Sequence, residues 1–265
     1  MTDTPLSFND PTSKKDARIL SRADGATIAY HKIDGDGPGI VFLGGFRSDM
    51  TGTKALALEE HCRLGNRAFV RFDYFAHGQS SGDFTEGTIG RWAEDAIYVL
   101  DEITDGKQIL IGSSMGGWIM LLAALARPDR VAALIGIAAA PDFTETFMWQ
   151  RYPEEVRVTL RRDGIYFQPT PYKEDPYAIT MKLIEDGREH LLLTRAMDIN
   201  CPVHLIQGMV DDAVPWRHAL AITENLASDR VTLTLVKDGD HRLSRDEDLG
   251  RLMRTLDAVC EDIGG

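Results

Sequence analysis

This 265-residue chain has few cysteines, no excess of positive charge and no long apolar run. Its three cysteines, Cys62, Cys201 and Cys260, lie far apart and form no CxxC pair, so the sequence indicates neither a disulfide framework nor a zinc site. The 41 acidic and 29 basic residues give a formal net charge of −12, which disfavours nucleic acid as a partner because phosphate binding needs a basic surface. No stretch approaches the ~18 apolar residues of a membrane-spanning helix.

The amino-terminal segment also lacks the pattern of a targeting sequence. Residues 1–16 are polar and contain no apolar run of the kind that a signal peptide requires. The segment is too acidic and too short to resemble a transit peptide. We therefore expect residues 1–16 to be frayed and the protein to be cytoplasmic.

The rest of the chain alternates between apolar runs and helical patterns. Residues 17–33 predict a hairpin, because two alternating runs flank Ala-Asp-Gly. Strands are then predicted at 39–45, 68–74, 108–114 and 131–140, with helices at about 52–64, 91–103 and 115–126 between them. Continuous apolar strands separated by amphipathic helices predict an α/β fold with a mostly parallel, doubly wound sheet.

This alternation stops between residues 141 and 200. The stretch is rich in aromatic side chains and has helical patterns around 144–161 and 173–189, but it does not fit another strand–helix unit. Strand and helix patterns return at 201–208, 215–227, 231–238 and 245–262. We therefore predict a core of residues 17–140 and 201–265, with residues 141–200 as a small, mainly helical cap insertion.

A candidate nucleophile follows the strand predicted at 108–114. Gly112-Ser113-Ser114-Met115-Gly116 matches G-x-S-x-G, in which a sharp strand-to-helix turn exposes the serine and small neighbours relieve the crowding. Gly78-Gln79-Ser80-Ser81-Gly82 fits the same pattern. Ser114 has an apolar strand before it and an apolar helix after it, whereas Ser80 lies in a polar stretch. Context therefore favours Ser114.

An acid and a base are expected after the serine, in the order Ser…Asp…His. Asp211 lies in the loop after the strand at 201–208, and we favour it over its neighbour Asp212 and over Asp142, which follows an earlier strand. His241 lies in the loop after the last predicted strand, and its main rival is His77. In this arrangement His241 takes the Ser114 proton while Asp211 fixes the imidazole tautomer.

Two backbone amides are candidates for an oxyanion hole. Met115 begins the helix after Ser114, so its N–H points toward a developing negative charge. The second donor is expected in the loop after the strand at 39–45, where Gly44 and Gly45 let the backbone approach closely and Phe46 carries the N–H.

These motifs together resemble one family of α/β-hydrolases. The strings are GGFRSDMTGTKALALEEHC (44–62), RFDY (71–74), GSSMGGW (112–118), LARPDRVAALIG (125–136), NCPVHLIQGMVDDAVPW (200–216) and DHR (240–242). They are similar to the mitochondrial acyl-protein thioesterase, which is also the mycophenolic acid acyl-glucuronide esterase, and to its bacterial relatives. The resemblance spans about residues 17–262 and implies hydrolysis of S-acyl thioesters, acyl glucuronides and other small esters. By position it implies the same three residues, Ser114, Asp211 and His241. One departure is Gly44, where the family has a proline before its glycine.

The sequence therefore predicts a serine hydrolase that acts through an acyl-serine intermediate and needs no metal or organic cofactor. Its substrate is expected to be a small-molecule acyl ester or thioester, with an S-acylated protein as a further candidate; no oligomeric state is indicated. Five side chains are candidates for an acyl pocket: Phe143, Phe147, Met148, Trp149 and Trp216. The alternatives are hydrolysis of a carbon–carbon bond, a perhydrolase reaction, or a non-catalytic binding protein of the same fold.

Overall fold

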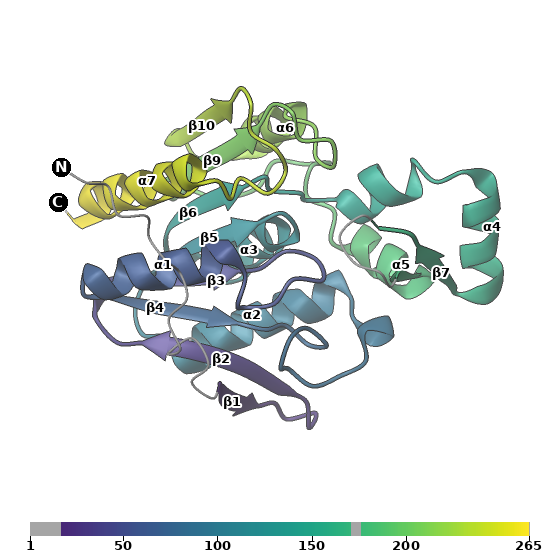
Figure 1. The fold of residues 1–265 in the computed structure, drawn as a ribbon, viewed down its shortest axis with the longest axis horizontal. Helices are drawn as coiled ribbons and strands as arrows, with labels where there is room; N and C mark the ends of the chain where they lie inside the picture. Colours follow the sequence, from purple (N-terminus) through teal and green to yellow (C-terminus); the bar gives the residue numbers. More distant parts are fainter. Residues whose placement is uncertain (1–16, 171–175, 265) are drawn as a thin grey trace.

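A mostly parallel sheet of eight strands forms the centre of the molecule (Figure 1). The computed structural model describes residues 17–170 and 176–264, so the expectation for residues 1–16 lies outside the described part of the chain. The strand order is β1-β2-β4-β3-β5-β6-β9-β10. β1 and β2 pair antiparallel, as do β2 and β4, and all the other pairs are parallel. The predicted α/β-hydrolase type of fold is confirmed. The strands are β1 Arg18–Ser21, β2 Thr27–Ile33, β3 Asp36–Leu43, β4 Arg67–Phe72, β5 Gln108–Ser113, β6 Val131–Ile137, β9 Val203–Gly208 and β10 Val231–Val236.

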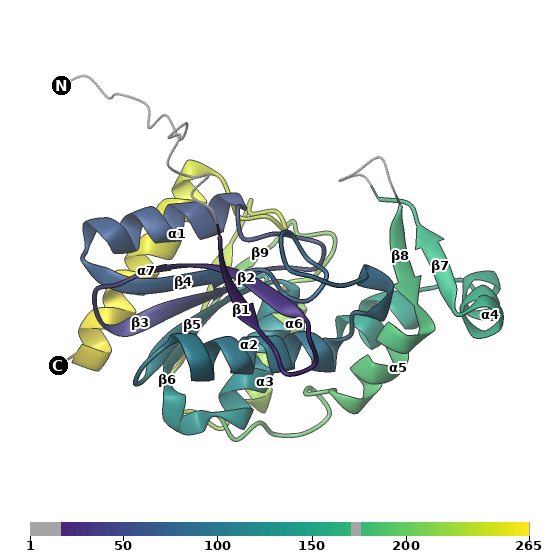
Figure 2. The same ribbon diagram turned by 90° about the horizontal axis from the view of Figure 1, so that it is seen from below.

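Helices cover both faces of this sheet (Figure 2). One face carries α1 (Thr53–Leu64) and α7 (Asp246–Gly264). The other carries α2 (Ile89–Ile103), α3 (Met115–Ala126) and α6 (Arg217–Asn225). Short 3₁₀ turns at Phe84–Glu86 and Pro128–Arg130 complete the connections. Within residues 17–170 and 176–264, no helix is long and apolar enough to cross a membrane.

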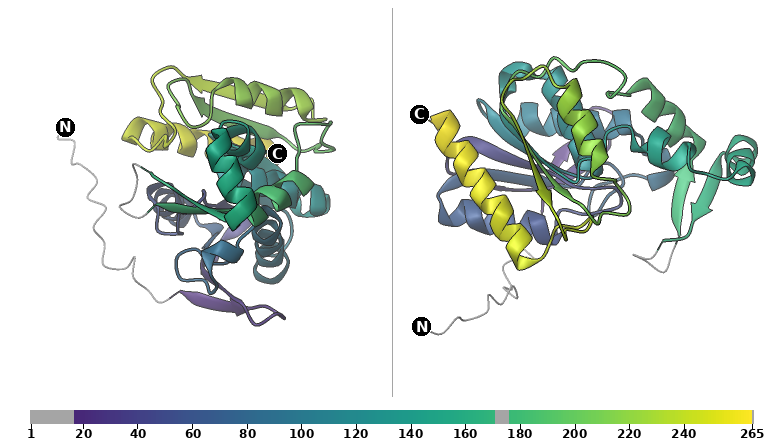
Figure 3. Two further views of the ribbon diagram at one scale, coloured as in Figure 1. Left: turned by 90° about the vertical axis from the view of Figure 1, so that its right-hand side faces the viewer. Right: turned by 90° about the horizontal axis from the view of Figure 1, so that it is seen from above.

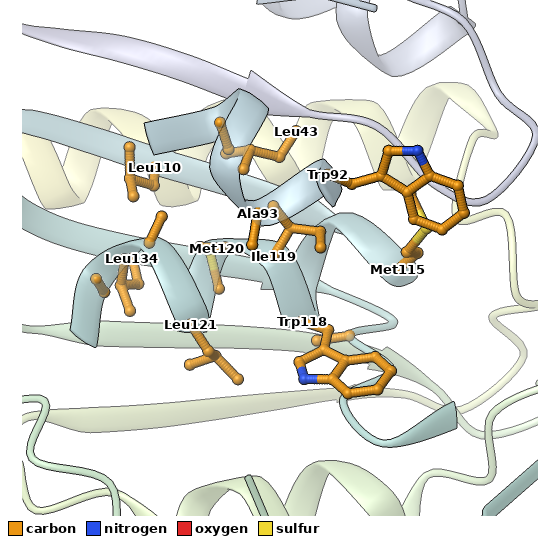
Figure 4. Close-up of a cluster of buried hydrophobic side chains, with 14 of the residues drawn as sticks. Leu43, Trp92, Ala93, Leu110, Met115, Trp118, Ile119, Met120, Leu121 and Leu134 are labelled. Carbon is orange, nitrogen blue, oxygen red and sulfur yellow. The ribbon is translucent and has the colours of Figure 1, made fainter. Parts of the chain in front are cut away.

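The central strand β5 shows why the buried strands read as unbroken apolar runs. All six of its residues are buried. Leu110 packs in the cluster beside α2 and α3, which Figure 4 shows together with Met120, Ile119 and Leu134. Ile109 and Ile111 point to the opposite face, toward α1 and α7. Because each face of β5 meets a helical layer, both sets of alternating side chains must be apolar.

The cap segment, residues 141–200, leaves the sheet between β6 and β9. It forms a π-helical turn at Thr144–Trp149, α4 (Glu154–Asp163), β7 (Ile165–Gln168), β8 (Tyr177–Thr180) and α5 (Met181–Glu189). Figures 1 and 3 show these elements gathered beyond one end of the sheet. They join no strand of the main sheet.

The antiparallel pair β7–β8 is a feature that the sequence prediction missed. Each strand has only four residues, and the helical patterns predicted at 144–161 and 173–189 ran through or up to them. The first pattern is interrupted at Pro153, where α4 has its N-cap, and ends at Gly164, whose φ of 75° terminates the helix. The second contains a helix only from Met181 onward, and residues 171–175 lie outside the described chain.

Candidate active site

The backbone at Ser114 makes a sharp turn between β5 and α3. Ser114 has φ 55° and ψ −119°, which is a strained conformation for a residue with a side chain. A Cβ on Gly112 would lie 2.4 Å from the carbonyl oxygen of Gly116, and a Cβ on Gly116 would lie 2.0 Å from that of Leu43. Both flanking positions therefore require glycine, and the strand–turn–helix context that was predicted for this motif is present.

Loops after four parallel strands converge on Ser114. Gly45 follows β3, Ser114 follows β5, Asp211 follows β9 and His241 follows β10. The carboxyl ends of parallel strands lie at one edge of a sheet, so side chains far apart in the sequence meet there. The Nε2 atom of His241 lies 3.1 Å from the Oγ atom of Ser114, and its Nδ1 atom lies 2.8 Å from Oδ2 of Asp211.

The carboxylate of Asp211 is buried and held by several donors. Its Oδ1 accepts hydrogen bonds from the backbone N–H groups of Ala213 at 2.9 Å and Val214 at 2.8 Å. Its Oδ2 accepts one from Nε2 of Gln207 at 2.9 Å, in addition to the contact with His241. Because Asp211 accepts at Nδ1–H of His241, the imidazole presents Nε2 as an acceptor toward the hydroxyl of Ser114. Sequence reasoning missed Gln207, whose only signal is its place at the end of β9.

The rival acids and the rival histidine lie in other environments. Asp142 is buried and accepts hydrogen bonds from the backbone N–H groups of Leu192 and Leu193 at 2.8 and 2.9 Å, and burial raises the pKa of this carboxyl. Asp212 is exposed. His77 accepts the N–H of Arg47 at Nε2, and its Nδ1 donates to the carbonyl of Phe75, at 3.2 and 3.1 Å.

The second G-x-S-x-G serine is hydrogen-bonded to the backbone. Ser80 Oγ accepts the N–H of Ala29 at 2.8 Å and donates to the carbonyl of Asp73 at 2.6 Å. Both bonds attach the loop after β4 to β2 and to the end of β4. The hydroxyl of Ser80 therefore helps to hold this loop in place.

One candidate oxyanion donor directly follows Ser114 in the chain, and the loop that carries the other comes close to Ser114. Met115 is the first residue of α3. Gly45, which precedes Phe46, comes so close to the serine that a Cβ placed on it would lie 3.5 Å from the Cβ of Ser114. The ring of Phe46 makes edge-to-face contacts with four aromatic rings at centroid distances of 5.2 to 5.9 Å, which fixes this loop against the cap segment; the four are Phe84, Trp92, Phe143 and Tyr177.

A cavity of about 590 Å³ opens above Ser114 and His241. Phe143, Phe147 and Met148, three of the five candidates for the acyl pocket, line it. Trp149 and Trp216, the other two candidates, are not among its described lining residues. Trp149 is the last residue of the π-helical turn, and the guanidinium groups of three arginines lie 4.6 to 5.9 Å from its ring centroid: Arg157, Arg161 and Arg188. Trp216 stacks with Arg217 at 4.4 Å.

The cavity also has a charged lining that sequence reasoning missed. Four cationic residues line it, namely Arg47, Lys54, Arg151 and Arg242, and Asp49 is the one acid among the described lining residues. The Arg47 guanidinium lies 4.2 Å from the ring centroid of Phe84, and that of Arg151 lies 4.5 Å from the ring centroid of Phe147. This lining is cationic although the whole chain carries a net charge of −12.

Comparison with known proteins gives relatives of similar length and fold. Residues 55–169 match a family described as the alpha/beta hydrolase fold. The human palmitoyl-protein thioesterase ABHD10, mitochondrial, is 39% identical over 251 residues, which are 94% of this chain and 82% of the human protein. The solved structure of mouse alpha/beta hydrolase domain-containing protein 10 is 38% identical and superimposes with a TM-score of 0.87 over 94% of this chain and 100% of its own. A putative hydrolase from Agrobacterium vitis S4 is 40% identical, with a TM-score of 0.87 over 92% of this chain and 97% of its own.

The relatives' names correct one prediction. The thioesterases from five mammals, at 38 to 39% identity, are all named mitochondrial. The predicted cytoplasmic location is contradicted by these names, which give the relatives a mitochondrial location. That prediction rested on the composition of residues 1–16 and on three cysteines that indicate no disulfide framework, and neither feature identified the compartment.

The aligned relatives, the sheet topology and the strand–turn–helix at Ser114 lead to the same assignment. The relatives are named as thioesterases, and together with the family match they identify the chain as a hydrolase of this fold. The chain belongs to the α/β-hydrolase superfamily, in the family of the ABHD10 palmitoyl-protein thioesterases.

Proposed function

We propose that this protein cleaves acyl thioesters and esters through a covalent acyl-Ser114 intermediate. The observation that carries the proposal is the chain of contacts from Ser114 Oγ to His241 Nε2 at 3.1 Å, and from His241 Nδ1 to Asp211 Oδ2 at 2.8 Å. A nucleophile, a base and a group that orients the base are thus within hydrogen-bonding reach of one another.

In the first half-reaction Ser114 attacks the acyl carbonyl. His241 Nε2 takes the Oγ proton as the bond from Oγ to the carbonyl carbon forms, and Asp211 stabilises the resulting imidazolium. The amides of Phe46 and Met115 donate to the oxyanion of the tetrahedral intermediate. When the intermediate collapses, the carbon–sulfur or carbon–oxygen bond breaks and His241 gives its proton to the leaving thiolate or alkoxide.

Water then completes the cycle. His241 accepts a proton from the water as its oxygen attacks the acyl-Ser114 carbonyl, and the second tetrahedral intermediate releases the carboxylic acid. The proton returns from His241 to the Ser114 oxygen. No electron transfer or further reactant is involved.

The apolar side chains of the cap segment are proposed to hold the acyl chain. Phe143, Phe147 and Met148 line the cavity and come from the first turn of that segment. Each methylene transferred from water to such a surface contributes about 0.8 kcal/mol. Longer acyl chains should therefore bind more tightly until the cavity is filled.

The cationic lining favours a second class of substrate, the acyl glucuronides. Their leaving group is a sugar that carries a carboxylate, and Arg47, Arg151 and Arg242 all line the cavity. Arginine binds carboxylates through bidentate hydrogen bonds. This candidate therefore rests on the charge of the cavity, whereas the thioesterase activity is supported by the names of the relatives.

Steady-state hydrolysis tests both substrate classes. An acyl thioester, an acyl glucuronide and p-nitrophenyl esters of increasing chain length should all be hydrolysed by the wild type but not by Ser114→Ala. Burst kinetics with the p-nitrophenyl esters would report accumulation of the acyl-enzyme. A folded wild-type protein that hydrolyses none of them would leave the carbon–carbon hydrolase, perhydrolase and non-catalytic alternatives.

A further inference from the structure

The loop that carries His241 has a strained backbone. It connects β10 to α7, and Leu243, two residues after the histidine, has φ 43° with a buried side chain. A branched residue in this conformation persists only when its surroundings hold it there. Asp240 contributes by accepting the N–H of Leu243 at 2.9 Å.

Lys54 attaches this loop to α1. Its Nζ atom donates to the carbonyl of Arg242 at 2.5 Å and to Oγ of Ser244 at 3.3 Å, and Ser244 Oγ itself donates to the same carbonyl at 2.9 Å. Lys54 therefore holds the residue that directly follows His241. It also lines the cavity above Ser114.

The helix that carries Lys54 is packed firmly into the core. Ala55, Leu58 and Cys62 of α1 are all fully buried in the cluster between α1, α7 and the sheet. Lys54 lies in the first turn of this helix, so its side chain spans a short distance from a packed element to a strained loop. The same loop ends in a separate ion-pair cluster, in which Arg245 contacts Asp238 and Asp248.

The charges that face Lys54 come from the loop and from α7. Burial is the largest effect and lowers the pKa of Lys54 to about 8. The charge of Arg242 also lowers this pKa, while those of Asp240 and Asp248 raise it. Asp248 is shared with Arg245 and Arg251, at 2.8 and 3.1 Å.

We propose, on the basis of the proposed function above, that Lys54 is a positioning residue that holds the loop of His241 in its catalytic geometry. A charged ammonium forms a stronger hydrogen bond to a carbonyl than a neutral amine does. The ammonium form is present below its pKa and is lost above it, so the loop is held in neutral solution and loosens in alkaline solution. Misplacement of a catalytic group by about 1 Å can cost about a hundredfold in rate.

The test compares Lys54→Arg and Lys54→Met with the wild type over a range of pH. The substrate is p-nitrophenyl butyrate, which has no titrating group, followed at the isosbestic wavelength of the product. We expect the wild-type kcat to fall above a pH of about 8. In Lys54→Arg, whose side chain stays charged, this fall should shift by more than one pH unit to the alkaline side. In Lys54→Met we expect kcat at neutral pH to drop about 10- to 100-fold with KM within about threefold.

Lys32 provides a matched control. Its Nζ atom also donates to a backbone carbonyl, that of Ile103 at 3.0 Å, but it lies on β2 and does not line the cavity. Lys32→Met should keep the wild-type kcat and its pH profile. The proposal would be overturned if the kcat of Lys54→Arg fell at the same alkaline pH as that of the wild type. It would also be overturned if Lys54→Met kept the wild-type kcat at neutral pH. If Lys54→Met fails to fold, the pH profile of Lys54→Arg decides alone. Absence of Ser114-dependent turnover in the wild type would instead refute the proposed function.

Discussion

Two serines in this chain lie in the same five-residue pattern, and the fold treats them in opposite ways. Ser114 has a strained backbone and faces His241 across 3.1 Å at the wall of a cavity. The hydroxyl of Ser80 makes two short hydrogen bonds to backbone groups of neighbouring strands. The pattern G-x-S-x-G thus describes a tight turn in both places. Reactivity depends on what lies before, after and above it.

The carboxylates near the two serines also differ in their hydrogen-bond partners. Asp73, whose carbonyl accepts from Ser80, has a carboxylate that accepts the backbone N–H groups of Met50 and Gln79 at 2.7 and 2.8 Å. Asp211 shares its carboxylate between backbone donors and His241. A polar group that is bonded only to backbone supports the fold, whereas one that also contacts a titratable side chain can take part in chemistry.

Replacing each serine in turn should give the largest difference in kcat between the two sites. Ser114→Ala should lower kcat by a factor on the order of 10⁴ or more, because the nucleophile is lost. Ser80→Ala should keep kcat within about threefold of wild type and lower the free energy of unfolding by about 1–3 kcal/mol, because the N–H of Ala29 loses its acceptor. Esterase kinetics and urea denaturation measure the two effects. Comparable losses of kcat in both variants would contradict the assignment of a catalytic role to Ser114 and a structural role to Ser80.

The two buried acids at strand ends extend the comparison. Asp211→Asn should lower kcat about 10⁴-fold with little change in folding, because the amide favours the wrong tautomer of His241. Asp142→Asn should keep its kcat per folded molecule and lose about 1–3 kcal/mol of stability, since one backbone N–H then faces an NH₂ group. Active-site titration with a slow substrate normalises both rates. If Asp142→Asn loses activity as severely as Asp211→Asn, the choice of acid is wrong.

The pH dependence of stability addresses the structural side of the contrast. Burial raises the pKa of Asp73 to about 6 from an ordinary value of 3.8. The native state therefore binds the proton more tightly than the unfolded chain, so the contribution is fully present below pH 4 and is lost as the pH rises through 6. The unfolding free energy of the wild type minus that of Asp73→Asn should fall by up to about 3 kcal/mol between about pH 4 and 7. Asp95, whose pKa burial also raises to about 6, is present in both proteins and cancels. A difference that is flat or rises with pH would contradict this.

A weaker effect should distinguish two aromatic side chains of the cap segment. Phe147 lines the cavity, while Trp149 packs among arginines outside it. Phe147→Ala should lower kcat/KM about tenfold for octanoyl esters and much less for acetyl esters, since the loss of apolar contact is felt only by a long chain. Trp149→Ala should leave the ratio of kcat/KM for octanoyl esters to kcat/KM for acetyl esters unchanged. An equal change of this ratio in both variants would show that the cavity is not the acyl site.

The sheet and the three residues at its edge could be predicted because each depends on local signals. The run Gln-Ile-Leu-Ile before Ser114 and the apolar helix after it mark a buried strand and helix, and turn residues place Asp211 and His241 directly after strands. In a parallel sheet the strand ends meet at one edge, so sequence position already determines spatial neighbourhood.

The cap segment was less predictable because its elements are short and carry weak local signals. The strands β7 and β8 have four residues each and pair antiparallel, from Ile165 opposite Thr180 to Gln168 opposite Tyr177. Whether Phe147 or Trp149 faces the cavity depends on a π-helical turn, which shifts side chains away from the ordinary helical spacing. The cationic lining had no signal at all, since Arg47 and Arg151 become neighbours of the cavity only through the fold.

Covalent labelling with a fluorophosphonate determines which serine, if any, is activated. The probe forms a stable bond only with an activated serine, and peptide mass spectrometry then identifies the labelled residue. We predict one adduct on the peptide that contains Ser114, absent from Ser114→Ala and strongly slowed in His241→Ala, with Ser80 unlabelled. An adduct on Ser80, or no adduct on folded wild-type protein, would contradict the assignment of Ser114 as the nucleophile.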